Sequence, residues 1–256
     1  MSSKNVNVYS LDGEVVREAE LPSAFSTSYR PDVIRKAVIA EESNKRQPYG
    51  SMFEAGMRHA VSTWGKGRGS ARVQRLTQGA KAAESPNNVG GRRAFPPKPE
   101  KSWELKVNRK ERALARWSAL AATSDDEMVK RRGHRFKEGV TLPVVFEDSV
   151  EKLETTVDVL RALESVGLQE DVARAKDSKT VRPGKGKMRG RRYKSARSLL
   201  IVVSDKGAPI FRGAKNLAGV EVVAPEQLNP GILAPGGDAG RLAVFSEAAL
   251  KKLGGW

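Results

Sequence analysis

The chain has 256 residues, of which 39% are hydrophobic, and this is enough for one or two domains with a sizeable core. Its 46 lysines and arginines outnumber its 30 aspartates and glutamates, and the resulting charge of +16 predicts a polyanionic partner. No apolar run approaches the roughly 20 residues of a membrane-spanning helix, which favours nucleic acid over a membrane as that partner. The absence of cysteine excludes disulfides and thiolate metal sites, and the N-terminus lacks an apolar signal region, so we expect a cytoplasmic protein.

The first predicted elements are a β-hairpin and a helix. Residues 5–21 alternate between apolar and polar around Asp12-Gly13, which is a hairpin turn signal. A helix is expected to begin at Pro31, because the N–H that proline lacks has no intrahelical partner at the first helical position. Asp32 in the first turn complements the helix dipole.

Residues 46–100 differ in composition from the rest of the chain. They carry ten lysines and arginines against three glutamates, with many glycines and prolines. Their valine, isoleucine and leucine residues are limited to Val61, Val73, Leu76 and Val89. Burying so little aliphatic area cannot offset an ordering entropy of roughly 1–2 kcal/mol per residue. A loop of this length is unusual in a compact domain, so we expect a partner to order it.

The remainder of the sequence alternates between predicted helices and strands. We expect a helix to resume near Lys101, and the other predicted elements are strands at 140–146, 199–203, 220–223 and 242–245 and helices at 150–163, ending before Gly167, and at 246–253. This alternation predicts an α/β fold, a layered body with a mostly parallel sheet flanked by helices. Residues 1–45 and 101–256 would form that body, and residues 46–100 would be a long basic extended loop.

The densest run of positive charge covers residues 181–194. With the nearby Arg197 it holds eight lysines and arginines and no acidic residue. Its interspersed glycines let the backbone approach a phosphate closely, and arginine offers a fork of donors that fits phosphate. A solvated linker is the alternative, but a linker has no need to avoid acids completely. The run lacks both the Walker pattern and Gly-x-Gly-x-x-Gly, so nothing here indicates a nucleotide or dinucleotide cofactor.

A second basic run lies at residues 64–72. Trp64 offers a stacking plane, and Lys66, Arg68 and Arg72 are separated by small residues that keep the backbone narrow. Stacking and phosphate contacts are how proteins hold irregular RNA. A disordered Gly/Arg tail is the alternative, although this run lies inside the chain between two strongly patterned helices.

Catalysis has little support in the sequence. His59 and His134 each lie beside an arginine, and we expect RNA or surface contacts from them rather than general bases. Asp125 and Asp126 follow Ser124 at a predicted helix start, where acids complement the dipole, so a carboxylate dyad is not favoured. We therefore predict no enzyme activity, no catalytic residue, no metal site and no cofactor.

Six strings resemble a known family, that of large-subunit ribosomal protein four of the archaeal and eukaryotic type. They occur in the family's order and span about residues 5–205: Tyr29-Arg-Pro-Asp-Val-Ile-Arg-Lys-Ala-Val38, Trp64-Gly-Lys-Gly-Arg-Gly69, Gly91-Arg-Arg-Ala-Phe-Pro-Pro97, Asn108-Arg-Lys-Glu-Arg112, Arg132-Gly-His-Arg-Phe136 and Gly184-Lys-Gly-Lys-Met-Arg-Gly-Arg191. The last string is very specific. The sequence ends at Trp256 without the long basic extension of the eukaryotic members, which favours the archaeal type.

The resemblance implies a structural protein of the large ribosomal subunit that binds 23S-type rRNA and aids subunit assembly. In the family an extended loop threads through this rRNA, and its tip lines the nascent-peptide exit tunnel near ribosomal protein twenty-two. By motif match, the tip would include Trp64, Lys66, Gly67, Arg68, Gly69 and Arg72. The expected partners are therefore rRNA, neighbouring large-subunit proteins and the nascent peptide, with no membrane.

The basic runs and the matched strings together define the candidate RNA-binding residues. They are Arg46, Trp64, Lys66, Arg68, Arg72, Arg75, Arg92, Arg93, Arg109, Lys110, Arg112, His134, Arg135, Lys185, Lys187, Arg189, Arg191, Arg192, Tyr193 and Lys194. Two other functions stay open at this point. A non-ribosomal RNA chaperone or packaging protein would carry similar charge, and an RNA-processing enzyme would need an acid or histidine cluster that the sequence does not reveal.

Overall fold

The computed structural model describes residues 4–254 and divides into two units. The first unit consists of Met1–Glu42 and Leu105–Trp256, and the second consists of Ser43–Glu104. We call the first unit the body and the second the loop unit.

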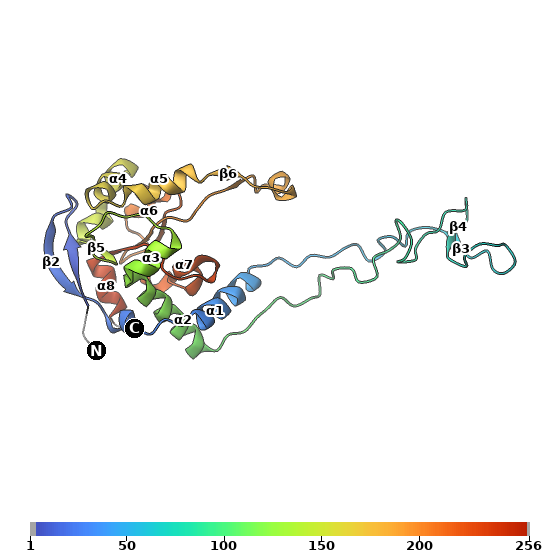
Figure 1. Ribbon diagram of the computed structural model, residues 1–256, viewed down its shortest axis with the longest axis horizontal. Helices are drawn as coiled ribbons and strands as arrows, with labels where there is room; N and C mark the ends of the chain where they lie inside the picture. The colour runs from blue at the N-terminus through green and yellow to red at the C-terminus, as the bar shows by residue number, and fades with distance from the viewer. Residues whose placement is uncertain (1–3, 255–256) are drawn as a thin grey trace. The chain divides into compact units, whose positions relative to one another are not determined.

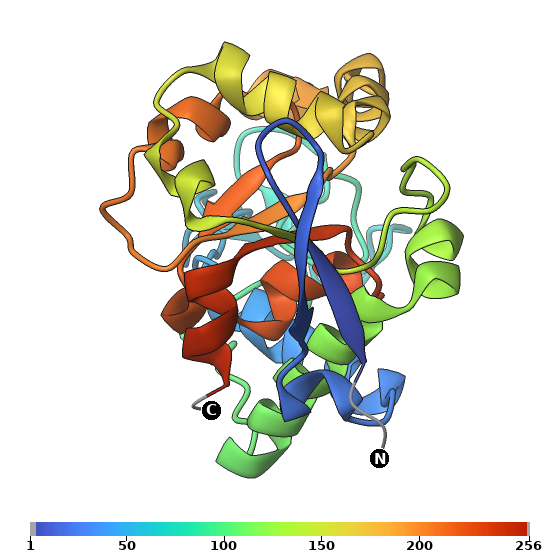
Figure 2. The same cartoon turned by 90° about the vertical axis from the view of Figure 1, so that its left-hand side faces the viewer.

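A six-stranded sheet forms the centre of the body (Figure 2). Its strands lie in the order β2-β1-β5-β10-β8-β9. Every neighbouring pair is parallel except β1 and β2, which pair in antiparallel fashion. In chain order the strands are β1 (Asn5–Tyr9), β2 (Val15–Glu20), β5 (Val144–Phe146), β8 (Leu200–Val202), β9 (Glu221–Val223) and β10 (Ala243–Ser246). The predicted α/β fold with a mostly parallel sheet is confirmed.

Helices cover both faces of this sheet. The α-helices are α1 (Pro31–Asn44), α2 (Arg109–Ala121), α3 (Asp126–Arg132), α4 (Thr156–Ser165), α5 (Gln169–Asp177), α6 (Ile210–Lys215), α7 (Pro230–Leu233) and α8 (Glu247–Leu253). Short 3-10 turns occur at Ser23–Ser26, Ala122–Ser124, Asp148–Lys152, Lys185–Arg189, Pro225–Gln227 and Pro235–Gly237.

Two hydrophobic clusters, one on each face of the sheet, make up the core. On one face Phe245 of β10 packs with Phe25 and with apolar residues of α1, α2, α7 and α8. On the other face Val244 packs with apolar residues of α3, α4, α5 and α6. Successive residues of one strand thus serve opposite layers, as the two-residue period of a strand requires. The result is a three-layer body.

The N-terminal elements follow the prediction. Strands β1 and β2 form a hairpin whose turn contains Gly13 at a φ of 87°, a left-handed conformation that glycine adopts without steric cost. Helix α1 begins at Pro31, with Asp32 in its first turn. The predicted strands at 199–203, 220–223 and 242–245 and the last helix are also confirmed to within about two residues.

Three predicted elements were wrong in their bounds. Helix α2 begins at Arg109 rather than near Lys101. The preceding residue, Asn108, has a ψ of 141°, which is not helical, so the helix does not extend further toward the N-terminus. Strand β5 covers Val144–Phe146 rather than starting at 140, since Pro143 lacks the N–H that a ladder position requires. The helix predicted at 150–163 consists of a 3-10 turn followed by α4, which restarts where the Thr155 hydroxyl accepts from the backbone N–H of Asp158.

The loop unit has almost no interior. Among residues 43–104, all of which the structure describes, Ala83 is the one buried hydrophobic residue. Regular structure is limited to β3 (Val61–Ser62) paired with β4 (Arg75–Leu76). The two flanks of the unit run side by side as extended chain, joined by the hydrogen bond from the Ser51 N–H to the Pro97 carbonyl at 3.2 Å (Figure 1). The predicted lack of a core in this segment is confirmed.

A hairpin projects from the body beyond the end of α5 (Figure 1). Its strands are β6 (Thr180–Val181) and β7 (Tyr193–Lys194), and the 3-10 turn Lys185–Arg189 lies between them. We call residues 180–194 the arm. No helix within residues 4–254 is long and apolar enough to cross a membrane.

Candidate nucleic-acid interface

The arm presents its cations to solvent. The six predicted lysines and arginines of this segment are all exposed, and none of its own residues is buried: Lys185, Lys187, Arg189, Arg191, Arg192 and Lys194. Gly184 and Gly190 have φ values of 79° and 76°, so these two positions need glycine to fold the chain back on itself. The short ladder of β6 and β7 therefore holds a compact group of positive charges with no core beneath it.

Tyr193 gives the arm an aromatic surface between two cations. The Lys179 ammonium lies 4.9 Å from the centre of the Tyr193 ring, and the Arg192 guanidinium lies 5.5 Å from it. The ring itself is 49% exposed. Sequence reasoning identified Tyr193 and Arg192 but missed Lys179, which the pairing of β6 with β7 brings opposite the ring.

Trp64 organises the predicted tip of the loop unit. Arg75 and Arg68 lie over its ring, with guanidinium carbons 4.9 and 5.6 Å from the ring centre. Arg75 also donates to the Ala80 carbonyl at 2.7 Å and is only partly exposed, whereas Lys66 and Arg72 are exposed. The structure therefore brings Trp64, Arg68 and Arg75 together and leaves Lys66 and Arg72 free to contact a partner.

The glycines of the tip adopt conformations that other residues avoid. Gly67 and Gly69 have φ values of 81° and 60°, and a Cβ added at either would meet nothing within 4 Å. A side chain would therefore fit at either position, and glycine is required because of the positive φ angle of the backbone. The narrow backbone predicted from the sequence is present.

A second aromatic cluster in the loop unit was not predicted. Tyr49 and Trp103 stack with ring centres 6.4 Å apart, and Arg46 and Lys101 lie over Trp103 at 5.0 and 4.5 Å. Sequence reasoning identified Arg46 alone. Tyr49 and Trp103 are 54 positions apart, and the available signal was an aromatic residue close to a cation in both flanks. Arg92 and Arg93 are exposed in the same unit.

Helix α2 begins with positive charge, against the usual preference. Arg109, Lys110 and Arg112 lie in its first turns and are exposed, with Glu111 as the acidic residue of the first turn. The positive end of the helix dipole disfavours cations at this position. An external polyanion would offset that cost, so the placement of these three cations is consistent with a nucleic-acid contact.

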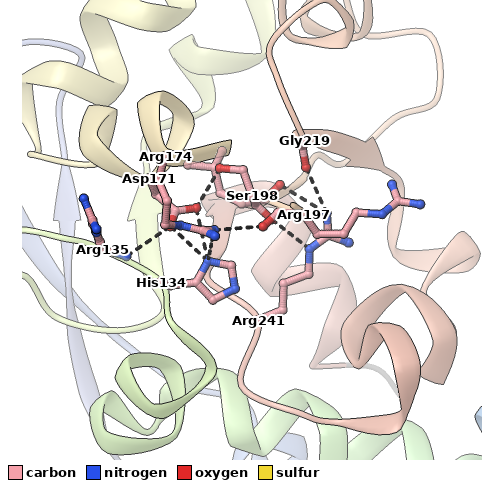
Figure 3. Close-up of polar contacts among 9 residues, drawn as sticks. His134, Arg135, Asp171, Arg174, Arg197, Ser198, Gly219 and Arg241 are labelled. Atoms are coloured by element: carbon pink, nitrogen blue, oxygen red, sulfur yellow. Dashed lines mark hydrogen bonds and ion pairs between the residues drawn. The ribbon is translucent and has the colours of Figure 1, made fainter. Parts of the chain in front are cut away.

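His134 corrects one expectation. Its side chain is buried in the body rather than placed on the surface. The Nδ1 atom lies 3.1 and 3.2 Å from the two carboxylate oxygens of Asp171 on α5 (Figure 3). The ring thus belongs to the interior, and the adjacent Arg135, which is exposed, remains as the candidate contact.

Asp171 is the centre of a buried polar network (Figure 3). Besides His134, its carboxylate accepts from the Arg135 backbone N–H at 3.0 Å, Arg174 Nε at 2.9 Å and Ser198 Oγ at 2.7 Å. Burial alone would raise the pKa of this carboxyl group. The hydrogen bonds from His134 and Arg174 outweigh burial and hold the pKa well below its ordinary value. The group is therefore a carboxylate at neutral pH, and it fixes the side chains around it.

Arg241 lies fully buried next to this network (Figure 3). It forms an ion pair with Glu221 of β9 and donates to the backbone carbonyls of Ser198 and Ile232. Burial lowers the pKa of Arg241, and the hydrogen bond that Arg241 donates to the Glu221 carboxylate opposes this shift. Glu221 also pairs with Arg197, so one carboxylate holds two arginines.

The acidic pair Asp125 and Asp126 lies at the start of α3, where the sequence predicted a helix to begin. The Asp125 side chain accepts from the Glu127 N–H at 3.0 Å and caps the helix, and Asp126 lies in its first turn. Within residues 4–254, no group of three histidines or acidic residues is placed to hold a metal ion. The surface that remains unexplained is the set of exposed arginines, lysines and aromatic rings described above.

Comparison with known proteins agrees with this surface. Residues 19–256 match the model of the ribosomal protein L4/L1 family. The chain is 50% identical over 246 residues to the large ribosomal subunit protein uL4 of Methanocaldococcus jannaschii, covering 96% of each chain. It is 49% identical to the uL4 protein of Methanoculleus marisnigri and 46% identical to that of Archaeoglobus fulgidus, over 96–98% of the chains compared. These relatives are archaeal, as the resemblance led us to expect, and the chain belongs to the ribosomal protein L4/L1 family.

Proposed function

We propose that this chain is a structural, non-enzymatic constituent of the large ribosomal subunit that binds 23S-type rRNA and aids subunit assembly in the cytoplasm. Membership of the family supports the structural role in the ribosome. The binding of rRNA, and the division of labour within the chain, rest on the geometry of the basic segments. Neighbouring large-subunit proteins would be its further partners.

The observation that carries this proposal is the construction of the loop unit. A segment with one buried hydrophobic residue cannot stabilise its own conformation, and its exposed charged groups are mainly arginine and lysine, accompanied by the exposed rings of Tyr49, Phe53 and Phe95. Arginine forks bind phosphate, and exposed rings stack on unpaired bases. Such a segment loses conformational entropy when it becomes ordered, and contacts with surrounding structured RNA would offset that cost.

The arm offers the same chemistry on a smaller scale. Its cations project from the body without an acidic neighbour in the segment, so a phosphate backbone is the partner that would neutralise them. Phosphate contacts of this kind position a protein on RNA and carry little sequence information. We assign to the arm, together with the start of α2, the role of fixing the body to rRNA.

The tip of the loop unit has a separate proposed role. In this proposal Lys66, Gly67, Arg68, Gly69 and Arg72 lie at the wall of the nascent-peptide exit tunnel, near ribosomal protein twenty-two, as the resemblance to the family implies. The narrow glycine backbone of the tip and its freely exposed Lys66 and Arg72 suit a confined passage. The growing peptide would then be a transient partner of the tip.

Salt-dependent binding tests the role of the arm. Replacing Arg189, Arg191 and Arg192 together with glutamine should weaken the binding of the full-length protein to large-subunit rRNA. Each lost phosphate contact should reduce the slope of log affinity against log salt by about 0.7–0.9. The matched control neutralises three exposed cations of the body helices, Arg161, Arg212 and Lys215, and should leave the slope unchanged. An unchanged slope in the arm variant would mean that its arginines face solvent.

Deletion of residues 62–74 tests the role of the tip. Incorporation into large subunits should persist, because the arm and most of the positive charge remain. Stalling by regulatory peptides and the response to tunnel-binding inhibitors should change. Mass spectrometry of purified subunits measures occupancy, and toeprinting measures stalling. If the variant is fully incorporated into large subunits and stalling is normal, the proposal that the tip lies in the tunnel is wrong. If the variant is missing from the subunits, these residues are primary contacts that hold the protein on rRNA.

A further inference from the structure

A cavity in the body lies next to the Asp171 network and outside the arm and the loop unit. Its volume is about 760 Å³. Six of its lining residues carry the chemistry considered below, Tyr29, Arg35, Arg131, Arg132, Arg174 and Arg197. Asp238 is the one acidic residue among those that line it. The cavity therefore combines five guanidinium groups with one exposed aromatic ring.

The walls of this cavity are held in place from behind. Asp171 binds Arg174, whose Nη2 atom also donates to the Arg197 carbonyl at 2.9 Å (Figure 3). Glu221 pairs with Arg197, and Asp238 pairs with Arg35 at 3.1 Å. These contacts distinguish the cavity from the arm, where few contacts fix the cations. Fixed donors bind an anion without a further loss of side-chain entropy.

The charge of the cavity wall is not fully compensated. Arg132 donates through Nη2 to the Pro235 carbonyl at 2.8 Å, but its Nη1 atom is buried and has no hydrogen-bond partner. Burial and the neighbouring Arg241 lower the pKa of Arg132, with Asp238 opposing them. With Arg241 beneath the wall, six arginines face three carboxylates, those of Asp171, Glu221 and Asp238. A bound anion would complete this arrangement.

The size and the lining of the cavity identify the kind of anion. A lone phosphate would fill a small part of 760 Å³, whereas a nucleotide adds a sugar and a base. Tyr29 is 43% exposed at the cavity and supplies a plane on which a base can stack. An acidic peptide would match the arginines but would make no special use of the ring.

We infer that this cavity receives one unstacked nucleotide of the large-subunit rRNA, with its phosphate against the arginine wall and its base against Tyr29. The inference rests on the proposed rRNA binding and adds a specific, preorganised site to the less specific contacts of the arm. The body would thereby recognise a local RNA shape, since a nucleotide must leave its stack to enter.

A pocket variant of the full-length protein tests this site. Tyr29→Leu combined with Arg131→Gln removes the stacking plane and one exposed cation, neither of which has a partner that fixes the fold among the described residues. Affinity for large-subunit rRNA should fall about tenfold or more, which is the range expected for the loss of one base-stacking contact. The salt slope should fall by about 0.7–0.9, for one phosphate. Tyr29→Phe should bind as the unaltered protein does, because the ring remains.

Matched controls separate this effect from loss of charge or of fold. Arg161→Gln combined with Arg212→Gln neutralises exposed cations of α4 and α6 outside the cavity, and it should bind rRNA within about twofold of the unaltered protein. Thermal unfolding of each variant confirms that the body is intact. If the pocket variant binds as this control does while the arm variant is weakened, the inference fails and the proposed function stands. If the unaltered protein does not bind rRNA at all, the proposed function fails.

Two further outcomes would indicate that the cavity binds something other than an rRNA nucleotide. Competition with AMP distinguishes a free nucleotide from one within RNA: if AMP removes the difference between the pocket variant and the unaltered protein, the cavity binds free nucleotides and the assignment to RNA is overturned. If the pocket variant binds rRNA normally but is lost from assembled subunits, the occupant is a protein, and the assignment is again overturned.

Discussion

Arginine serves two different purposes in the two units of this protein. In the body, Arg174, Arg197 and Arg241 are paired with carboxylates that are buried or partly buried. In the loop unit, Arg46, Arg68 and Arg75 lie over tryptophan rings, Arg75 also donates to a backbone carbonyl, and none of these three arginines forms an ion pair with a carboxylate of the described residues. The comparison teaches that net charge alone does not locate a binding surface. A carboxylate within reach fixes an arginine in one position, as at the wall of the cavity, whereas without one the side chain is ordered only when a partner binds.

The largest expected difference between the two units is in their resistance to proteolysis. Global opening of a folded domain costs about 5–15 kcal/mol, while a segment without a core opens at almost no cost. In the free protein a non-specific protease should therefore cut within residues 46–100 at least about a thousandfold faster than within the packed parts of the body, residues 109–179 and 195–250. Mass spectrometry of timed digests gives both rates. Equal cleavage rates, or protection of the loop unit in the absence of RNA, would contradict the proposed difference in stability between the loop unit and the body.

Replacement of Asp171 tests whether the body depends on its carboxylates. Asp171→Asn should lower the free energy of unfolding by about 3 kcal/mol, because it leaves the partly buried Arg174 without its charge partner and weakens a buried hydrogen-bond network. Asp177→Asn, at an exposed position of the same helix, is the control and should change stability by less than about 0.5 kcal/mol. Urea denaturation monitored by tryptophan fluorescence measures both. Equal changes in unfolding free energy for the two variants would show that the Asp171 network contributes little to the stability of the body.

The same carboxylate should make stability depend on pH in the acid range. Because the pKa of Asp171 in the folded body lies far below its ordinary value, the unfolded chain takes up a proton near pH 4 while the folded chain does not. The stabilisation is then complete at neutral pH and decreases as the pH falls below about 4. The difference in unfolding free energy between the unaltered protein and Asp171→Asn should shrink over this range. A difference that stays constant would contradict the assignment.

The smallest expected effect concerns the aromatic cluster of the loop unit. Trp103→Leu should change the unfolding free energy of the body by less than about 0.5 kcal/mol, because this ring belongs to a unit with no core. Phe245→Leu in the core of the body is the comparison and should cost about 1 kcal/mol. Affinity for rRNA should show the opposite order, with Trp103→Leu weakening binding more than Phe245→Leu does. Loss of body stability in Trp103→Leu would show that the two units fold together.

The sequence predicted the parts of the fold that depend on local patterns. Alternating apolar residues and turn glycines located the N-terminal hairpin, and the apolar run at 199–203 located a buried strand. The bounds at 101–108 and 150–155 were missed because a helical spacing of apolar residues continues through segments that are not α-helical, the first without regular structure and the second a 3-10 turn followed by extended residues. A pattern of side chains does not contain the capping contact that decides where a helix starts.

The interface was predictable only where its residues are neighbours in the sequence. The arm and the tip consist of contiguous runs and were found. The partner of His134 is Asp171, which lies 37 positions away on α5, so the burial of this histidine could not be anticipated. The cavity is further from prediction still, because it draws Tyr29, Arg131 and Arg197 from separate elements. Such a site forms only when the chain folds, so the composition of the sequence does not reveal it.

The buried Arg241 has a consequence for how the body opens. Strands β5, β8 and β9 have three residues each, and ladders this short provide few backbone hydrogen bonds. The guanidinium of Arg241 donates to carbonyls at positions 198 and 232 and pairs with Glu221, so it joins three segments that are distant in the sequence. None of the three can separate without leaving this cation unsatisfied in the interior. Amide hydrogen exchange in these segments should therefore be cooperative, with all three exchanging in a single opening event.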